Sequence, residues 1–233
     1  MHSARFDGSF SGWRQVARQL LAQHIAPQEI TWCEQDADDD LFARTLVPTE
    51  PPAAQAPVRV PRQLLELLEQ AARLNAVVVG SVITRAADGS YRNRLYWARP
   101  DGSCAHYDKR HLFRMAGEHK HYTPGERQVQ FEINGWRVRP LICYDLRFPV
   151  WSRDPQDTDL LLYTANWPGA RRHHWNRLLP ARAIENLCYV AAVNRIGTDD
   201  KGHAYTGDSQ VLDFQGESLL APGAAAGVFR VSL

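Results

Sequence analysis

The feature that most constrains the fold is a series of short apolar runs, joined by turn-forming pairs, that begins near residue 76. Val77–Ile83 is typical of a buried strand, and Asp88–Gly89 after it favours a hairpin turn. A second hairpin is predicted where Asn134–Gly135 joins the runs at 129–133 and 136–142, because this pair tolerates positive φ angles. This part of the chain therefore predicts strands that pair locally.

One helix is predicted among these strands, over residues 172–186. Its apolar residues are expected on one side of the helix: Trp175, Leu178, Leu179 and Ile184. Further strands are expected at residues 94–98, 159–164, 189–194, 210–214 and 228–231. Strands that alternate with helices and hairpins predict a layered α/β domain.

Residues 1–75 differ from the rest of the chain in their sequence pattern. Helical spacing of apolar residues over 10–24 is followed by a short strand, Glu29–Cys33. Five prolines within residues 47–61 exclude a helix or a central strand there, so we expect a linker or surface arm. A helix is predicted from Pro61 to about Arg73, with proline in its first turn. We therefore divide the chain at residue 75.

Composition excludes several classes of protein. A net charge of +1, from 27 basic and 26 acidic residues, gives no general attraction to nucleic acid or membranes. No apolar run approaches the length of a membrane span, and residues 1–5 do not open a signal peptide. The four cysteines are scattered: Cys33, Cys104, Cys143 and Cys188. Their spacing argues against a disulfide framework or zinc site and for a cytoplasmic protein.

Cys143 is the candidate nucleophile. It stands at the end of the apolar run 138–142, before an Arg-Phe-Pro turn signal at 147–149. A strand would hold the sulfur rigidly, and the turn after it could aim backbone N–H groups at an oxyanion. A free cysteine on a strand is more often a small buried apolar residue, so Cys143 alone is weak evidence.

Lys109 is the second candidate, between two small apolar blocks in residues 107–113. Its ammonium could keep a thiolate ionised and then polarise the oxyanion. This chemistry also needs a carboxylate as general base, which deprotonates the thiol and later activates water. The lysine and cysteine together are far more specific than either residue alone.

Five blocks carry a resemblance to a known family. Residues 107–125 (YDKRHLFRMAGEHKHYTPG) are similar to the lysine block of the nitrilase superfamily, and residues 143–153 (CYDLRFPVWSR) to its cysteine block. The downstream blocks are Ala165–Pro168, Ala181–Asn186 and Gly207–Ser209. The subgroup that the chain resembles is the omega-amidase-like bacterial carbon–nitrogen hydrolases, over residues 76–233.

The resemblance implies a four-layer αββα sandwich that usually dimerises. It also implies hydrolysis of a small amide through a thioester, without a metal or organic cofactor. Cys143 would be the nucleophile, Lys109 the oxyanion lysine, and Glu118 the second glutamate, which positions the lysine and substrate. Tyr144 would lend its backbone N–H to the oxyanion. Asp145 and Arg147 would brace the loop after the nucleophile.

Residues 1–75 depart from the family pattern. The family's general base follows a proline at the end of a strand, and no Pro-Glu pair follows an apolar strand here. Glu34, after the short strand 29–33, is the nearest substitute, and it would serve only if that strand lies beside the strand 141–143. The segment resembles instead the start of bacterial DNA-metabolism proteins associated with uracil-DNA-glycosylase-like enzymes. The carboxyl end, at Leu233, looks shortened.

Two function classes stay open. The first is an amidase, active as a homodimer on a small amide that bears a carboxylate. The second is a catalytically impaired nitrilase-fold protein or binding module, linked to DNA metabolism through residues 1–75. Near-neutral charge argues against nucleic acid as a direct partner. A Cys-His protease using His111, His119 or His121 is the weaker reading, because all three lie within the lysine block.

Overall fold

The computed structural model describes residues 30–33, 62–153, 158–220, 223 and 226–233. The predicted helix over 10–24, the proline segment at 47–61 and Glu34 lie outside these residues. The chain forms two compact units. We call residues 40–129 the lysine unit, and residues 1–39 with 130–233 the cysteine unit.

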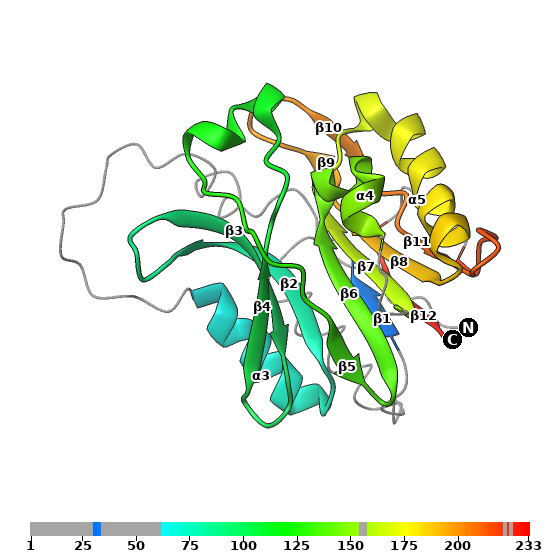
Figure 1. Ribbon diagram of the computed structural model, residues 1–233, viewed down its shortest axis with the longest axis horizontal. Coiled ribbons are helices and arrows are strands. Elements are labelled where there is room, and N and C mark those ends of the chain that lie inside the picture. Colours follow the sequence, from blue (N-terminus) through cyan, green and yellow to red (C-terminus); the bar gives the residue numbers. More distant parts are fainter. Residues whose placement is uncertain (1–29, 34–61, 154–157, 221–222, 224–225) are drawn as a thin grey trace. The chain divides into compact units, whose positions relative to one another are not determined.

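The lysine unit is a three-stranded antiparallel sheet with one helix packed against it (Figure 1). The strand order is β2 (Val78–Arg85), β3 (Tyr91–Ala98) and β4 (Cys104–Asp108), and the helix is α3 (Arg62–Leu74). Close approach of helix and sheet requires a small residue in β2. A Cβ added to Gly80 would lie 3.2 Å from a methyl carbon of Leu67 in α3.

The first predicted hairpin is confirmed. Gly89 has φ of 81° and its N–H donates to the carbonyl of Ala86, so the turn uses the conformational freedom of glycine. β3 begins at Tyr91, earlier than the predicted start at residue 94.

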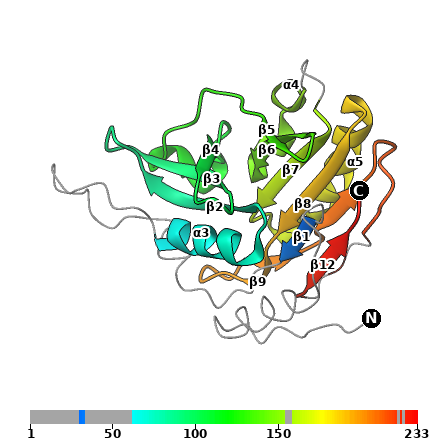
Figure 2. The same cartoon turned by 90° about the horizontal axis from the view of Figure 1, so that it is seen from below.

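The main sheet of the cysteine unit has five strands in the order β11-β8-β7-β6-β5. Their bounds are β5 Phe131–Ile133, β6 Trp136–Ile142, β7 Leu160–Ala165, β8 Tyr189–Asn194 and β11 Gln210–Leu212. β6, β7 and β8 run parallel (Figure 2), so their carboxyl ends meet at one edge of the sheet. This edge carries Cys143.

The predicted turn between β5 and β6 is confirmed. Asn134 and Gly135 have φ of 50° and 81°, as expected for the two central residues of a type I′ hairpin turn.

Helix α5 (Arg172–Asn186) has the predicted bounds, but one residue was assigned to the wrong side. Trp175 and Leu179 are buried, whereas Ile184 is 53% exposed. Ile184 follows Trp175 by about two and a half helical turns, so it lies on the opposite face of the helix.

Two small antiparallel pairs complete the cysteine unit. β1 (Ile30–Cys33) pairs with β12 (Val228–Val231), and β9 (Ile196–Thr198) pairs with β10 (Ala204–Thr206). The β9–β10 hairpin was not predicted from the sequence. The short helix α4 (Pro149–Ser152) follows the turn at Cys143.

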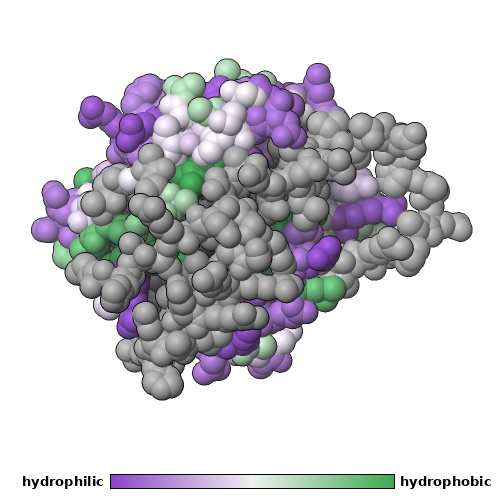
Figure 3. All heavy atoms as spheres, turned by 180° about the vertical axis from the view of Figure 1, so that it is seen from behind, coloured by the Kyte–Doolittle hydropathy of each residue, from purple (hydrophilic) through white to green (hydrophobic). Residues whose placement is uncertain are grey.

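On the face that Figure 3 shows, the coloured residues include both hydrophilic and hydrophobic areas. Within the described ranges, the large exposed apolar side chains are Leu65, Met115, Val150, Ile184, Leu187, Phe214 and Leu219. Among the residues described, no helix has both the length and the apolar character needed to cross a membrane.

Candidate active site

Cys143 occupies a sharp turn between a strand and a 3₁₀ helix. β6 ends at Ile142, and Cys143 begins the 3₁₀ helix Cys143–Arg147 with φ of 45°. Few residues other than glycine adopt this left-handed conformation, and such strain is concentrated at functional sites. The half-buried thiol donates to the carbonyl oxygen of Asn166 at 3.8 Å. The turn thus presents the sulfur at the carboxyl edge of the sheet.

Asp145 stabilises this turn. Its carboxylate is fully buried, and Oδ2 accepts the backbone N–H of Ile142 at 3.0 Å. Its carbonyl accepts the N–H of Phe148 at 3.0 Å, which closes the other end. The bracing role inferred for Asp145 therefore matches the geometry.

The buried guanidinium of Arg182, in α5, also stabilises the turn at Cys143. Arg182 donates through Nε and Nη2 to the carbonyl of Leu146, at 3.1 and 2.7 Å, and through Nη1 to Glu185 at 2.9 Å. Sequence reasoning placed Arg182 in a family block but assigned it no role. Its function depends on a tertiary contact that spacing alone does not reveal.

Asn194, at the end of β8, fixes the loop that contacts the thiol. Its Oδ1 accepts the N–H of Trp167 at 2.6 Å, and its Nδ2 donates to the carbonyls of Trp167 and Gly207, at 3.2 and 2.7 Å. The amide is buried and fully hydrogen-bonded. Asn194 therefore sets the position of the neighbouring Asn166 carbonyl. The predicted strand end at residue 194 was the available signal for it.

Aromatic rings and a guanidinium pack around the turn. The ring of Tyr144 lies edge-on to Phe148 with centroids 5.3 Å apart, and Arg147 lies over Trp167 at 5.2 Å. Nη2 of Arg147 is 2.6 Å from Nδ1 of His174. Desolvation, with neighbouring positive charges, lowers the pKa of His174, so its ring is neutral at pH 7 and accepts this hydrogen bond.

Lys109 is buried in the lysine unit and bound to Glu118. Its Nζ lies 2.8 and 2.7 Å from the two carboxylate oxygens of Glu118. Glu118 also accepts hydrogen bonds from the side chain of Asn93, at 3.3 Å, and from the backbone N–H of Phe113. Both carboxylate oxygens are therefore occupied, and the ammonium is held in one position.

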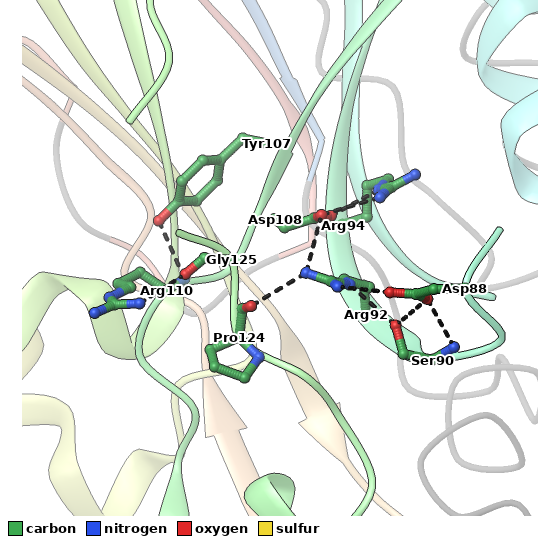
Figure 4. Close-up of polar contacts among 9 residues, drawn as sticks. All are labelled: Asp88, Ser90, Arg92, Arg94, Tyr107, Asp108, Arg110, Pro124 and Gly125. Carbon is green, nitrogen blue, oxygen red and sulfur yellow. Dashed lines mark hydrogen bonds and ion pairs between the residues drawn. The ribbon is translucent and has the colours of Figure 1, made fainter. Parts of the chain in front are cut away.

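The residues that flank Lys109 are fixed by their own contacts (Figure 4). Arg94 binds Asp108 through two hydrogen bonds, of 2.6 and 2.9 Å, and the N–H of Arg110 donates to the Tyr107 hydroxyl at 3.3 Å. Gly125 donates to the Lys109 carbonyl at 2.8 Å. A Cβ on Gly125 would lie 2.1 Å from the Asp108 carbonyl oxygen, so only glycine fits there.

The geometry agrees with part of the sequence analysis. Lys109 and Glu118 form the pair that the resemblance implied, while the catalytic roles of Cys143, Lys109, Glu118 and Tyr144 remain predictions. Within the part of the chain that the structure describes, no group of three or more His, Cys, Asp or Glu side chains is arranged to hold a metal ion.

The placement considered for Glu34 is not observed. β1, which precedes Glu34, pairs with β12, whereas the sheet partners of β6 are β5 and β7. The strand before Glu34 therefore does not pair with the strand before Cys143.

A family model described as carbon-nitrogen hydrolase matches residues 43–229. The chain belongs to the carbon–nitrogen hydrolase family. The family match begins at residue 43, inside the segment 1–75. The resemblance of this segment to proteins associated with uracil-DNA-glycosylase-like enzymes finds no support in the comparisons. The division at residue 75 remains a prediction.

Individual relatives agree with the family. The chain is 56% identical over 156 residues to omega-amidase YafV of Yersinia enterocolitica, covering 66% of this chain and 60% of that protein. It is 38% identical over 160 residues to 2-oxoglutaramate amidase of Bacillus subtilis, covering 67% and 61%. The chain thus spans about three-fifths of the length of these curated relatives.

A solved structure extends the agreement to the fold. XC1258 of Xanthomonas campestris, a CN-hydrolase superfamily protein with an arsenic adduct in its active site, superposes with a TM-score of 0.76. Sequence identity is 37%, over 99% of this chain and 87% of that one. The fold class is therefore the α/β sandwich of the nitrilase superfamily, as predicted.

Removing the Asp145 carboxylate tests the turn at Cys143. Asp145→Ala leaves the buried N–H of Ile142 without its acceptor, and we expect the free energy of unfolding to fall by about 1–3 kcal/mol. Urea denaturation measures this, with Glu132→Ala, an exposed carboxylate of the same unit, as control. Equal stabilities for the two variants would contradict the bracing role.

Breaking the buried ion pair tests how the lysine unit stabilises Lys109. Glu118→Ala leaves the ammonium of Lys109 buried without its carboxylate, and we expect a loss of about 3–5 kcal/mol in unfolding free energy. The double variant Lys109→Met, Glu118→Gln removes the uncompensated charge and should be more stable than Glu118→Ala. A double variant that is no more stable than the single one would show that the charge is not the cause.

Proposed function

We propose that this protein hydrolyses the carbon–nitrogen bond of a small amide through a thioester on Cys143. The observation that carries the proposal is the strained turn at Cys143, which presents a partly exposed thiol at the end of a strand in a carbon–nitrogen hydrolase. The arsenic adduct in the active site of XC1258 supports a reactive site in this fold.

The substrate class follows from chemistry and from the relatives. Proteins named omega-amidase and 2-oxoglutaramate amidase are similar to this chain over about two-thirds of its length. We infer a primary amide that also carries a carboxylate, such as the omega-amide of a 2-oxo acid.

The first half-reaction forms the thioester. A carboxylate base takes the thiol proton, and the Cys143 sulfur attacks the amide carbonyl carbon. The negative charge that develops on the carbonyl oxygen is stabilised by the ammonium of Lys109 and the backbone N–H of Tyr144. The tetrahedral intermediate collapses, the carbon–nitrogen bond breaks, and the nitrogen takes up the proton and leaves as ammonia.

The second half-reaction releases the acid. Water gives a proton to the base and attacks the thioester carbonyl carbon, again forming an oxyanion beside Lys109. The carbon–sulfur bond breaks, and the thiolate of Cys143 recovers a proton. Neither half-reaction needs a redox step or an external group. The family resemblance likewise implies hydrolysis without a metal or organic cofactor.

Glu118 acts as a positioning residue in this scheme. Its two oxygens already accept four hydrogen bonds, from Lys109, Asn93 and Phe113, so it is poorly placed to take a further proton. The general base is then a different carboxylate. Glu34 loses its support as this base, because the strand before it pairs with β12 and not with β6.

The wider context follows the same reasoning. We expect a homodimer, because the family usually dimerises, and a cytoplasmic location, because the four cysteines are scattered. We expect a small amide rather than nucleic acid as the partner, because the net charge is only +1. The second candidate function is an impaired hydrolase or binding module, including a link to DNA metabolism through residues 1–75. The observation that favours this second candidate is that both carboxylate oxygens of Glu118 bind the ammonium of Lys109, which leaves Glu118 poorly placed to act as a base. Ammonia release by the purified protein separates the two.

Replacing Lys109 tests its role as the oxyanion lysine. We expect Lys109→Ala to slow thioester formation by roughly 100-fold or more, because a preorganised donor to the oxyanion is lost. Ammonia release in a single turnover, with enzyme in excess over amide, measures this step. Lys120→Ala is the control, since Lys120 is exposed and follows Glu118 by only two residues. Near-normal turnover in Lys109→Ala would remove Lys109 from the reaction.

A further inference from the structure

Asn93, in β3, contacts both members of the ion pair of the lysine unit. Its backbone carbonyl accepts the N–H of Lys109 at 2.9 Å, and its side-chain Nδ2 donates to Oε1 of Glu118 at 3.3 Å. The same carboxylate oxygen lies 2.8 Å from Nζ of Lys109. These contacts form a closed ring of three residues. Asn93 therefore holds both the backbone of the lysine and the carboxylate that binds its side chain.

The segment that carries the glutamate is attached to the same part of β3. The N–H of Thr123 donates to the carbonyl of Tyr91 at 2.8 Å, and Nη1 of Arg92 donates to the carbonyl of Pro124 at 3.1 Å (Figure 4). Tyr91 and Arg92 are the first two residues of β3 and directly precede Asn93. The position of the glutamate relative to β3 is therefore fixed by this segment as well as by the ion pair.

The carboxylate of Glu118 accepts a hydrogen bond from a different segment on each oxygen. Oε1 accepts from Asn93, and Oε2 accepts from the backbone N–H of Phe113. Nζ of Lys109 lies 2.8 and 2.7 Å from these two oxygens, so the ion pair is bidentate. The carboxylate cannot rotate away from this arrangement without losing one of the two donors. Only the donor of Asn93 belongs to a side chain, so a substitution can remove it.

A bidentate contact fixes the direction of the third ammonium proton. An ammonium has three N–H donors, and the two contacts with Glu118 take two of them. The third N–H of Lys109 then points in a direction set by the other two, because the substituents of the nitrogen are tetrahedrally arranged. A donor that is aimed before the reaction stabilises an oxyanion without having to reorient during the step.

Building on the proposed function, we propose that Asn93 is a positioning residue that keeps the Lys109–Glu118 pair bidentate and so aims the third N–H of Lys109. All of the contacts that carry this proposal lie within the lysine unit. Asn93 touches no reacting atom in this scheme and acts through the lysine. Its loss should therefore slow formation of the oxyanion, and should have little effect once Lys109 has been removed.

A double-mutant cycle on Asn93 and Lys109 tests this coupling. Ammonia release in a single turnover is measured for the wild type, Asn93→Leu, Lys109→Ala and the double variant. Asn93→Leu keeps the approximate size of the side chain without its donor. We expect it to slow thioester formation about tenfold, as the loss of a hydrogen bond to a charged group does. In the Lys109→Ala background the same change should slow the reaction less than about twofold.

Thr84→Val is the matched control, because it removes a buried hydrogen bond to the hydroxyl of Tyr96 in the same sheet. It should leave the rate of thioester formation unchanged. An equal loss from Asn93→Leu with and without Lys109 would show a general structural effect and overturn the positioning role. A rate for Asn93→Leu equal to that of the wild type would overturn it as well.

Asn93→Asp keeps the test decisive if Asn93→Leu does not fold. The introduced carboxyl group has almost the size of the amide, but it donates to Glu118 only when it is protonated. We expect its rate, divided by that of the wild type at the same pH, to rise as the pH falls from about 8 to about 5, because the neighbouring carboxylate favours protonation. A ratio that stays constant with pH would contradict the role of the amide donor. A wild-type protein that releases no ammonia would instead overturn the proposed function, and this inference with it.

Discussion

The left-handed backbone of Cys143, with φ of 45°, is the constraint on which the described cysteine site depends. A residue with a side chain keeps this conformation only where its surroundings enforce it. Here the buried carboxylate of Asp145 ties the turn to the strand, and the guanidinium of Arg182 holds the carbonyl of Leu146. The strain is therefore local, and helix α5 contributes to the site without bearing a reacting group.

The lysine unit buries the ammonium of Lys109 away from water. Desolvation of a single charge is expensive, and a carboxylate in direct contact offsets it. Glu118 provides that carboxylate, and Asn93 and Phe113 complete its hydrogen bonds. This arrangement explains why one glutamate of the proposed chemistry is not free to serve as its base.

The sequence predicted those parts of the structure that local patterns determine. The turn at Asn134–Gly135 needs positive φ angles, and the bounds of α5 follow from helical spacing, so both were found. The β9–β10 hairpin was missed because its strands have three residues each and lack an alternating apolar pattern. The hydrogen bonds of Asn194 were missed for another reason, since its partners are remote in sequence. Cys143, Lys109 and Glu118 were recognised from family blocks, not from physical patterns alone.

The most direct test of the account is the mass of the intact protein, measured after rapid mixing with a 2-oxo acid omega-amide and acid quenching. The account predicts an adduct equal to the acyl group, located on Cys143 by peptide mapping and formed together with one equivalent of ammonia. Cys143→Ala should form neither adduct nor ammonia. Ammonia release without an adduct at Cys143, undiminished in Cys143→Ala, would contradict the thioester mechanism.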